Sequence, residues 1–277
     1  LQIRLEGAVA IVSLNRPDKL NAMHWAMWQS IRAAMQWADR TPEVRAVVLR
    51  GEGAHFTSGI DLPMFMGLQQ QVADDCEARL REKLRALVLE LQDTLTSLER
   101  CRKPVLAAIH GACIGGGIDL VTACDMRYCS ADAWFSVREI DVGMTADVGT
   151  LQRLPGLIGE GMARELAYTG RRVDGAEAKE MRLVNRCYES AETLHAGVME
   201  TARTIAAKSP LAIRGCKEMI TYARDHTVAE GLEWAAVMQG SIWNTADVLA
   251  AIQARMTRTP AGFAPLAPHA GIGTGEG

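Results

Sequence analysis

Hydrophobic positions along the chain fall into short apolar runs separated by amphipathic stretches, a pattern typical of strands alternating with helices. Apolar runs predict strands at 8–14, 44–50, 103–110 and 126–129. Helical periodicity covers 23–38 and 75–100, and a short helix is expected to follow the glycine triplet 115–117. This alternation predicts an α/β fold built from repeated crossover units. The helix at 75–100 has one apolar stripe, formed by leucines at 80, 84, 87, 91, 95 and 98.

The last third of the chain has a different, mostly helical pattern. Periodic stretches predict helices at 160–169, 190–207, 209–225, 227–239 and 245–256. We expect these helices to pack on the core or on a neighbouring subunit. The sequence therefore divides into a core over 1–190, a helical region over 191–258 and a flexible tail over 259–277, which is rich in Pro, Gly and Ala.

Composition excludes several classes of protein. With 277 residues, 48% of them hydrophobic and 23% charged, the chain has the make-up of a folded globular protein. A net charge of -3 offers no general cationic surface for nucleic acid. No apolar run is long enough to span a bilayer, so no membrane partner is expected. The seven cysteines lack Cys-x-x-Cys spacing and the histidines are scattered, so we expect free thiols in a reducing compartment and no metal site.

An acidic residue interrupts the most apolar stretch of the chain. Asp119 lies within 111–124 (GACIGGGIDLVTAC), and Glu139 and Asp147 follow closely. Burying a carboxylate is costly, so a buried acid finds a partner or shifts its pKa. Each acid taken singly could be structural, as a helix cap or as a surface acid beside Arg138 or Arg153. Together, near a glycine-rich turn, the three acids predict a site that moves protons.

Two glycine-containing loops, 51–61 and 111–117, each follow a predicted strand. Backbone without side chains lets a ligand approach closely, and two free N–H groups could form an oxyanion hole for a carbonyl that gains negative charge. The alternative is that the glycines only allow a helix to pack tightly on a strand. The triplet fits neither a dinucleotide fingerprint nor a phosphate-binding P-loop.

Three motifs resemble the crotonase (enoyl-CoA hydratase/isomerase) superfamily: 14–22 (LNRPDKLNA), 56–62 (FTSGIDL) and 103–117 (KPVLAAIHGACIGGG). The resemblance covers roughly 1–256. It implies a crotonase-like spiral of ββα units with a C-terminal helical trimerisation region, assembled as a homotrimer or a hexamer (dimer of trimers). It also implies an acyl-CoA thioester substrate and no cofactor beyond the CoA that the substrate carries. The N–H groups of Ile60 and Gly116 would form the oxyanion hole, and the substrate-binding residues would be Ser58, Gly59, Ile60, Asp61, Leu62, Gly116 and Gly117.

The acids distinguish the branches of this superfamily. Enoyl-CoA hydratases typically place Glu at the positions of both Asp119 and Glu139, and tend to have a small residue where this chain has Asp147. The Asp, Glu, Asp set instead resembles Δ3,5-Δ2,4-dienoyl-CoA isomerases. That resemblance predicts an isomerase of fatty-acid β-oxidation in which Glu139 takes a proton from C2 and Asp147 returns one to C6. Asp119 would be a polar partner that tunes Glu139.

Two other functions stay open on the sequence. One is an enoyl-CoA hydratase, which adds water to a 2-enoyl-CoA. The other is a non-catalytic binding or scaffold protein with the same fold. We expect a bacterial cytoplasmic location, with the mitochondrial or peroxisomal matrix as the alternative for a eukaryotic chain.

Overall fold

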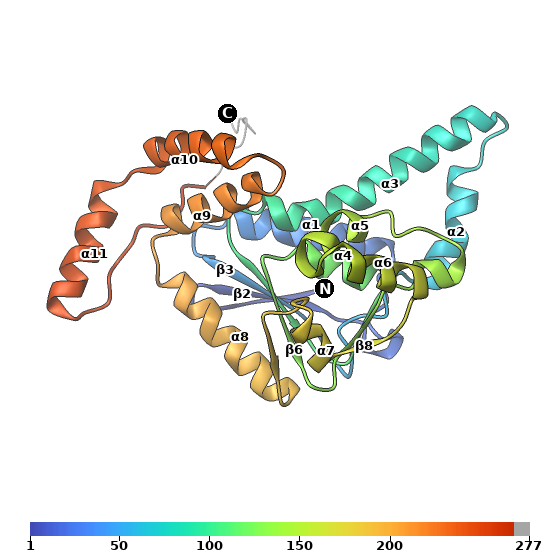
Figure 1. Ribbon diagram of the computed structural model, residues 1–277, viewed down its shortest axis with the longest axis horizontal. Coiled ribbons are helices and arrows are strands. Elements are labelled where there is room, and N and C mark those ends of the chain that lie inside the picture. Colours follow the sequence, from blue (N-terminus) through green and yellow to red (C-terminus); the bar gives the residue numbers. More distant parts are fainter. Residues whose placement is uncertain (269–277) are drawn as a thin grey trace, which may run out of the picture.

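A six-stranded sheet forms the centre of the molecule (Figure 1). The computed structural model describes residues 1–268. Strand order is β1-β2-β3-β4-β6-β9; β1 pairs antiparallel with β2, and every other pair is parallel. The strands are β1 (Gln2–Glu6), β2 (Val9–Leu14), β3 (Ala46–Gly51), β4 (Val105–Ile109), β6 (Met126–Ser130) and β9 (Arg186–Tyr188). The four predicted strands and the crossover pattern are confirmed.

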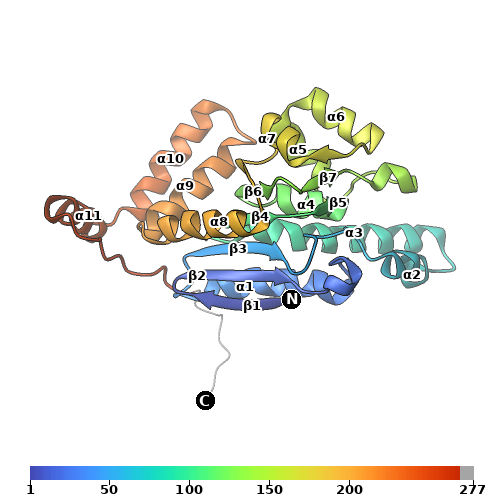
Figure 2. The same ribbon diagram turned by 90° about the horizontal axis from the view of Figure 1, so that it is seen from below.

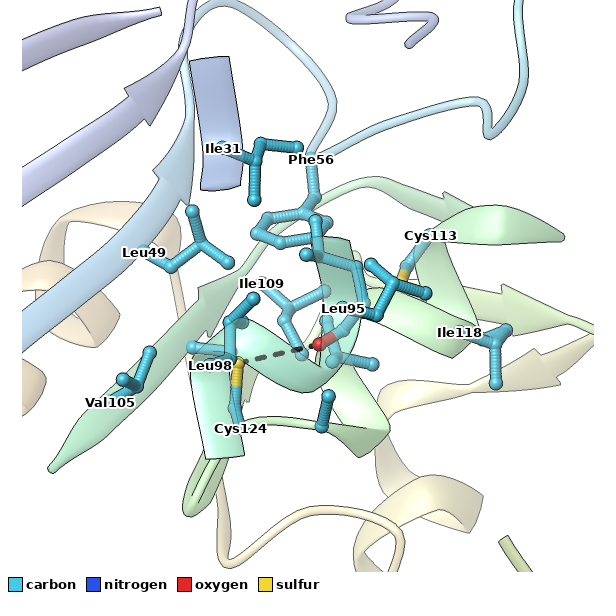
Figure 3. Packing of buried hydrophobic residues seen from close by; sticks show 14 of the residues in the cluster. Ile31, Leu49, Phe56, Leu95, Leu98, Val105, Ile109, Cys113, Ile118 and Cys124 are labelled. Atoms are coloured by element: carbon cyan, nitrogen blue, oxygen red, sulfur yellow. Dashed lines mark hydrogen bonds between the residues drawn. The ribbon is translucent and has the colours of Figure 1, made fainter. Parts of the chain in front are cut away.

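Helices cover both faces of this sheet (Figure 2). On one face, alternate strand residues such as Val48 and Leu106 pack against α8 (Ala191–Ala206). On the other, their neighbours such as Leu49 pack with α1 (Trp25–Arg40) and α3 (Glu77–Arg100). Side chains of a strand point alternately to opposite faces. Because helices cover both faces of this sheet, its buried strands need apolar residues at consecutive positions. Figure 3 shows part of the hydrophobic cluster on the face covered by α1 and α3, in which Phe56, Ile109 and Leu95 come from three separate segments.

A second, three-stranded sheet lies beside the first and carries the glycine-rich turn. Its strands are β5 (Ala112–Ile114), β7 (Trp134–Ser136) and β8 (Val173–Asp174), in the order β5-β7-β8. The remaining short helical segments are η1 (Pro17–Lys19), α2 (Leu62–Val72), α4 (Gly116–Thr122), η2 (Glu139–Val142), α5 (Thr150–Ile158), α6 (Glu160–Thr169) and α7 (Gly175–Glu180).

Helix α3 extends beyond the sheet and, with α2, forms an arm at one end of the molecule (Figure 1). Its stripe is buried at the four leucines nearest the C-terminal end of the helix, whereas Leu84 is 44% exposed. The predicted apolar stripe is therefore confirmed as a core-facing surface only in the C-terminal half of α3. Among the described residues, no helix is long and apolar enough to cross a membrane.

The C-terminal helices α9 (Pro210–Ala223), α10 (Val228–Ile242) and α11 (Thr245–Thr257) lie at the other end, with α11 farthest from the sheet (Figure 1). All were predicted within a few residues. Part of the expected tail runs back along the core: Leu266 is buried, and Arg45 donates to the carbonyl oxygen of Phe263 over 2.5 Å. The rest of that tail, 269–277, lies outside the described residues.

Candidate active site

The two glycine loops meet at the ends of β3 and β4. The Ile114 N–H donates to the Thr57 carbonyl oxygen over 3.2 Å, and the Met23 N–H donates to the Gly59 oxygen over 2.8 Å. Gly59 has a φ of +90°, and a Cβ there would lie 2.6 Å from the Ile114 oxygen. Both the backbone conformation and the close approach therefore require glycine at this position.

Two backbone donors are left free where these loops meet. Over residues 1–268, the N–H groups of Ile60 and Gly116 have no hydrogen-bond acceptor. A Cβ placed on Gly116 would lie 3.8 Å from the Ile60 nitrogen, so the two backbones are neighbours. Gly116 is also the first residue of α4, where helical geometry leaves N–H groups without intrahelical partners. This pair is suited to bind one oxygen that gains negative charge.

Asp119 is fully buried on α4, at 0% exposure. Its Oδ1 accepts a 2.6 Å hydrogen bond from the Thr150 N–H, and its Oδ2 has no partner among the described atoms. Burial, and then the negative charge of Glu139, raise the pKa of Asp119 to about 7, although the Thr150 hydrogen bond opposes that rise. Asp119 is therefore a carboxyl whose proton can leave or return near neutral pH.

Glu139 lies at the start of η2, directly over the glycine turn. A Cβ on Gly115 would lie 3.2 Å from Glu139 Oε1, which places the carboxylate against the turn that carries the Gly116 N–H. Glu139 Oε2 is buried without a partner in the described structure. Burial raises the pKa of Glu139; nearby backbone N–H groups lower it, and the charge of Asp147 raises it further.

Asp147 is half-buried on the turn before α5, and burial raises the pKa of its carboxyl. Its main-chain oxygen accepts a 2.7 Å hydrogen bond from Nε2 of Gln92, on α3. The charges of Glu139 and Asp147 both act on Asp119, so the three predicted acids share one electrostatic environment. Coupled carboxyls titrate as a group, because each ionisation hinders the next.

Over residues 1–268, no lysine or arginine forms an ion pair with these three acids. The two arginines beside them in sequence are engaged elsewhere: Arg138 pairs with Asp141, and Arg153 pairs with Glu99. Within the described chain, neither Glu139 nor Asp147 forms an ion pair. The interpretation of these two as ordinary surface acids paired with a neighbouring arginine is therefore wrong. Nor do the described residues contain a group of three or more His, Cys, Asp or Glu side chains placed to hold a metal ion.

The predicted substrate-binding segment begins at the loop and ends in α2. Asp61 is already engaged, because its carboxylate pairs with Arg16 and accepts from the Met64 N–H over 3.2 Å as the cap of α2. The Arg16 hydrogen bond is the main reason that the pKa of Asp61 is lowered. Leu62 points outward and is largely exposed. Asp61 and Arg16 also line an open hollow of about 710 Å³ beside α2, together with Pro63 and Met64.

The chain matches a known protein family over most of its length. Residues 4–263 match the family model described as enoyl-CoA hydratase/isomerase. The chain belongs to the enoyl-CoA hydratase/isomerase family. Within this family it is 42% identical over 262 residues to a protein of Arabidopsis thaliana named "Delta(3,5)-Delta(2,4)-dienoyl-CoA isomerase, peroxisomal", covering 94% of both chains.

Other family members extend the comparison. A Rattus norvegicus protein named "Delta(3,5)-Delta(2,4)-dienoyl-CoA isomerase, mitochondrial" is 45% identical over 249 residues, which are 89% of this chain and 76% of the relative. A crystal structure of enoyl-CoA hydratase from Bacillus anthracis superposes with a TM-score of 0.86 at 30% identity, covering 95% of this chain and 98% of that one. These likenesses confirm the predicted superfamily and its fold.

Two contacts of the site carried no signal in the sequence. Gln92 is one polar residue among many on a long amphipathic helix, and nothing in its surroundings distinguishes it. The Thr150 N–H belongs to α5, a helix that the sequence did not predict. Only the fold brings these groups to Asp147 and Asp119, from more than thirty residues away in each case.

Proposed function

We propose that this chain is a Δ3,5-Δ2,4-dienoyl-CoA isomerase, converting a 3,5-dienoyl-CoA into the conjugated 2,4-dienoyl-CoA in fatty-acid oxidation. The observation that carries the proposal is that an acid cluster and a pair of backbone donors lie side by side. Three mutually interacting acids without a cation lie beside two free backbone N–H groups. Acids supply proton transfer, and the donors stabilise the enolate that forms between the transfers.

In the first step, the thioester oxygen lies between the N–H groups of Ile60 and Gly116, and the Glu139 carboxylate removes a proton from C2. The electrons of that C–H bond move into the conjugated system, so the oxygen gains negative charge and a dienolate forms. The two N–H groups have no competing acceptor in the described structure, so they are available to this charge. They act more strongly on the dienolate than on the neutral thioester, which is what accelerates the step.

In the second step, Asp147 gives a proton to C6 and the electrons return to form the 2,4-diene. This requires a protonated Asp147, and burial favours that form by raising its pKa. Asp119 contributes through its charge: it lies close enough to Glu139 for the two carboxyls to interact, so an ionised Asp119 would raise the proton affinity of that base. Base and acid come from separate segments, η2 and the turn before α5, as removal and return of protons at opposite ends of a diene require.

The names of the two relatives support the isomerase, since both are called dienoyl-CoA isomerases. The structural relative supports the alternative, because it is named an enoyl-CoA hydratase. Asp119 favours isomerisation: its Oδ1 is held by the Thr150 N–H, which leaves one oxygen for any other contact. A hydratase needs two carboxylates free to hold one water.

The experiment is a paired absorbance assay of the purified protein. A 3,5-dienoyl-CoA should give the absorbance of a conjugated 2,4-dienoyl thioester, while a 2-enoyl-CoA should lose little absorbance. Rapid hydration of the 2-enoyl-CoA without diene formation would establish the hydratase instead. If neither substrate changes but an acyl-CoA binds, the binding-protein alternative would replace both.

We also propose a homotrimer, or a pair of trimers, assembled through the C-terminal helices. Large apolar side chains lie exposed on α10 and α11, and exposed patches of this kind mark association surfaces. The members are Val228, Leu232 and Val237 on α10, Leu249, Ile252 and Met256 on α11, and Trp243 between the two helices. Light scattering of the purified protein would give the mass. For location we retain the bacterial cytoplasm, with the mitochondrial or peroxisomal matrix as the alternative; the relatives' names point to peroxisome and mitochondrion.

A further inference from the structure

Gln92 is the side chain that fastens the Asp147 turn to the rest of the protein. Its amide Nε2 donates to the Asp147 main-chain oxygen over 2.7 Å. Across the described chain, that oxygen has no other donor, because α5 begins only at Thr150 and its first turn is anchored on the Gly149 oxygen. The carbonyl of the residue that carries the proposed acid is therefore held by one side chain from another element.

The surroundings of this contact are open and polar. A cavity of about 360 Å³ lies between the Asp147 turn and α3, lined among others by Gln92, Glu99, Gly149 and Arg153. A cavity of this size and polarity holds water. Ala146 and Val148, on either side of Asp147, pack into the core, whereas on the cavity side the turn is held by the polar contacts that cross the gap.

Three contacts cross from α3. Arg153 pairs with Glu99 over 2.8 Å and reaches Thr96 over 3.4 Å, and Gln92 reaches the Asp147 oxygen. The first two hold α5 itself, six residues beyond the acid. Between them Gly149 has a φ of +134°, and a Cβ there would lie 1.8 Å from Arg153 Nη1, so the chain bends sharply at that point. The Arg153 anchor thus fixes the helix, and Gln92 fixes the part before the bend.

We propose that Gln92 is a positioning residue for Asp147, which sets the reach of its carboxyl toward C6 of the substrate. This inference rests on the isomerase function proposed above. Gln92 itself does not touch the substrate. Loss of its hydrogen bond would let water take its place at the carbonyl and let the turn move into the cavity. A misplacement of about 1 Å in a reacting group can cost about a hundredfold in rate.

The consequence is selective for one of the two proton transfers. Glu139 lies on η2 and, in the described structure, shares no hydrogen bond with Gln92, so proton removal at C2 should continue. Return of a proton to C6 should slow. In D₂O, an enzyme in this state would exchange the C2 hydrogen of a 3,5-dienoyl-CoA for deuterium while forming little 2,4-diene. A general loosening of the site would slow both processes together.

The test uses Gln92→Met, which keeps the length and removes the donor, with Gln152→Met as the matched control. Gln152 lines the same cavity and has no hydrogen bond from its side chain in the described structure. Diene formation by absorbance and C2 exchange by mass spectrometry are measured on the full-length protein. We expect Gln92→Met to lose about ten- to a hundredfold in diene formation with C2 exchange within about twofold of wild type. The control should retain both.

A second variant, Gln92→Glu, supplies an independent readout. Its new carboxyl cannot donate when ionised but can donate an O–H to the Asp147 oxygen when protonated. The ratio of its diene-forming rate to that of Gln92→Met should therefore rise as the pH falls through the pKa of the new carboxyl, and titrations common to both variants cancel.

Unchanged diene formation in Gln92→Met, equal loss of exchange and diene formation, or a ratio independent of pH would each overturn the proposal. An inactive wild type would instead overturn the proposed isomerase itself.

Discussion

Two acids six residues apart, Asp119 buried and Asp125 partly buried, have opposite kinds of neighbours. Asp125, just after α4, pairs with Lys217 of α9 over 2.8 Å and accepts from the Val105 N–H over 2.7 Å. Lys217, itself 6% exposed, also donates to the main-chain oxygens of Leu98 and Lys103. Asp119, inside α4, has a single backbone donor and acidic neighbours.

The difference separates structural charge from chemical charge. At the Asp125–Lys217 joint the fold supplies a cation and a backbone donor, which oppose the rise that burial causes in the pKa of Asp125, and the pair ties the C-terminal helices to the sheet. At the acid cluster, no ion pair in the described structure opposes the effect of burial. The pKa values of Asp119, Glu139 and Asp147 are raised there without a compensating cation, and raised values suit the proton transfer proposed for this site.

The largest effect is expected on catalysis from Glu139→Gln. Removing the proposed general base should lower the isomerisation rate by about a hundred- to ten-thousandfold, because the C2 proton loses the carboxylate proposed to take it. Diene formation by absorbance is the measurement. Asp141→Asn in the same short helix is the control, since that residue is exposed and only pairs with Arg138. A Glu139→Gln enzyme with near-normal activity would remove the acid cluster from the mechanism.

The next effect concerns stability at the joint. Lys217→Met should cost up to about 3–5 kcal/mol in the free energy of unfolding, because it leaves the partly buried Asp125 carboxylate without its cation. Urea unfolding measures it. Adding Asp125→Asn to the same chain should recover part of the loss, since the carboxamide no longer needs a cation and still accepts from Val105. A single-variant loss below about 1 kcal/mol would contradict the structural role of this pair.

A pH-dependent effect should mark the cluster. The folded Asp119 keeps its proton up to about pH 7, whereas the unfolded residue loses it near 3.8. The folded state therefore binds more protons between these values, and stability falls as the pH rises from about 4 to 7. Asp119→Asn removes this titration, so its unfolding free energy should fall less over that window, by at most roughly 4 kcal/mol. Parallel wild-type and variant curves of stability against pH would argue against a buried, proton-binding Asp119.

The smallest effect is expected at Asp61, next to the predicted oxyanion donor. Asp61→Ala should cost about 1–2 kcal/mol, because α2 loses its cap at the Met64 N–H and Arg16 loses its partner. Asp61→Asn retains an acceptor for the cap and should lose less. Thermal unfolding of both variants compares them. Equal losses would show that the ion pair with Arg16, and not the cap, is what Asp61 contributes.

The sequence predicted the elements whose patterns are long. Buried parallel strands and amphipathic helices show continuous or periodic apolar positions, so β2, β3, β4, β6 and the C-terminal helices were found. Strand β1 was missed because it is an exposed edge, and α5 because Pro155 lies inside it. The short strands β5, β7 and β8 are two or three residues long, too short for any period to show.

The residues of the site likewise fall into those that the sequence indicates and those that only the fold reveals. Acids and glycines are rare enough in apolar surroundings to be noticed, so Asp119, Glu139, Asp147 and the two loops could be proposed from the chain itself. Contacts made by ordinary residues could not. The hydrogen bonds from Gln92 and Thr150 depend on the crossing of α3 with the Asp147 turn and on the start of an unpredicted helix, which are properties of packing and not of local composition.

The two free donors at Ile60 and Gly116 belong to the main chain, and this has an evolutionary consequence. Point mutations replace side chains but leave an N–H at every position except proline, so the proposed ability to bind an acyl oxygen would persist through most single substitutions. The acids have no such protection, since one codon change removes each of them. If the donors act as proposed, a lineage with this scaffold can exchange one reaction for another by replacing a few carboxylates while it inherits the binding of the thioester unchanged.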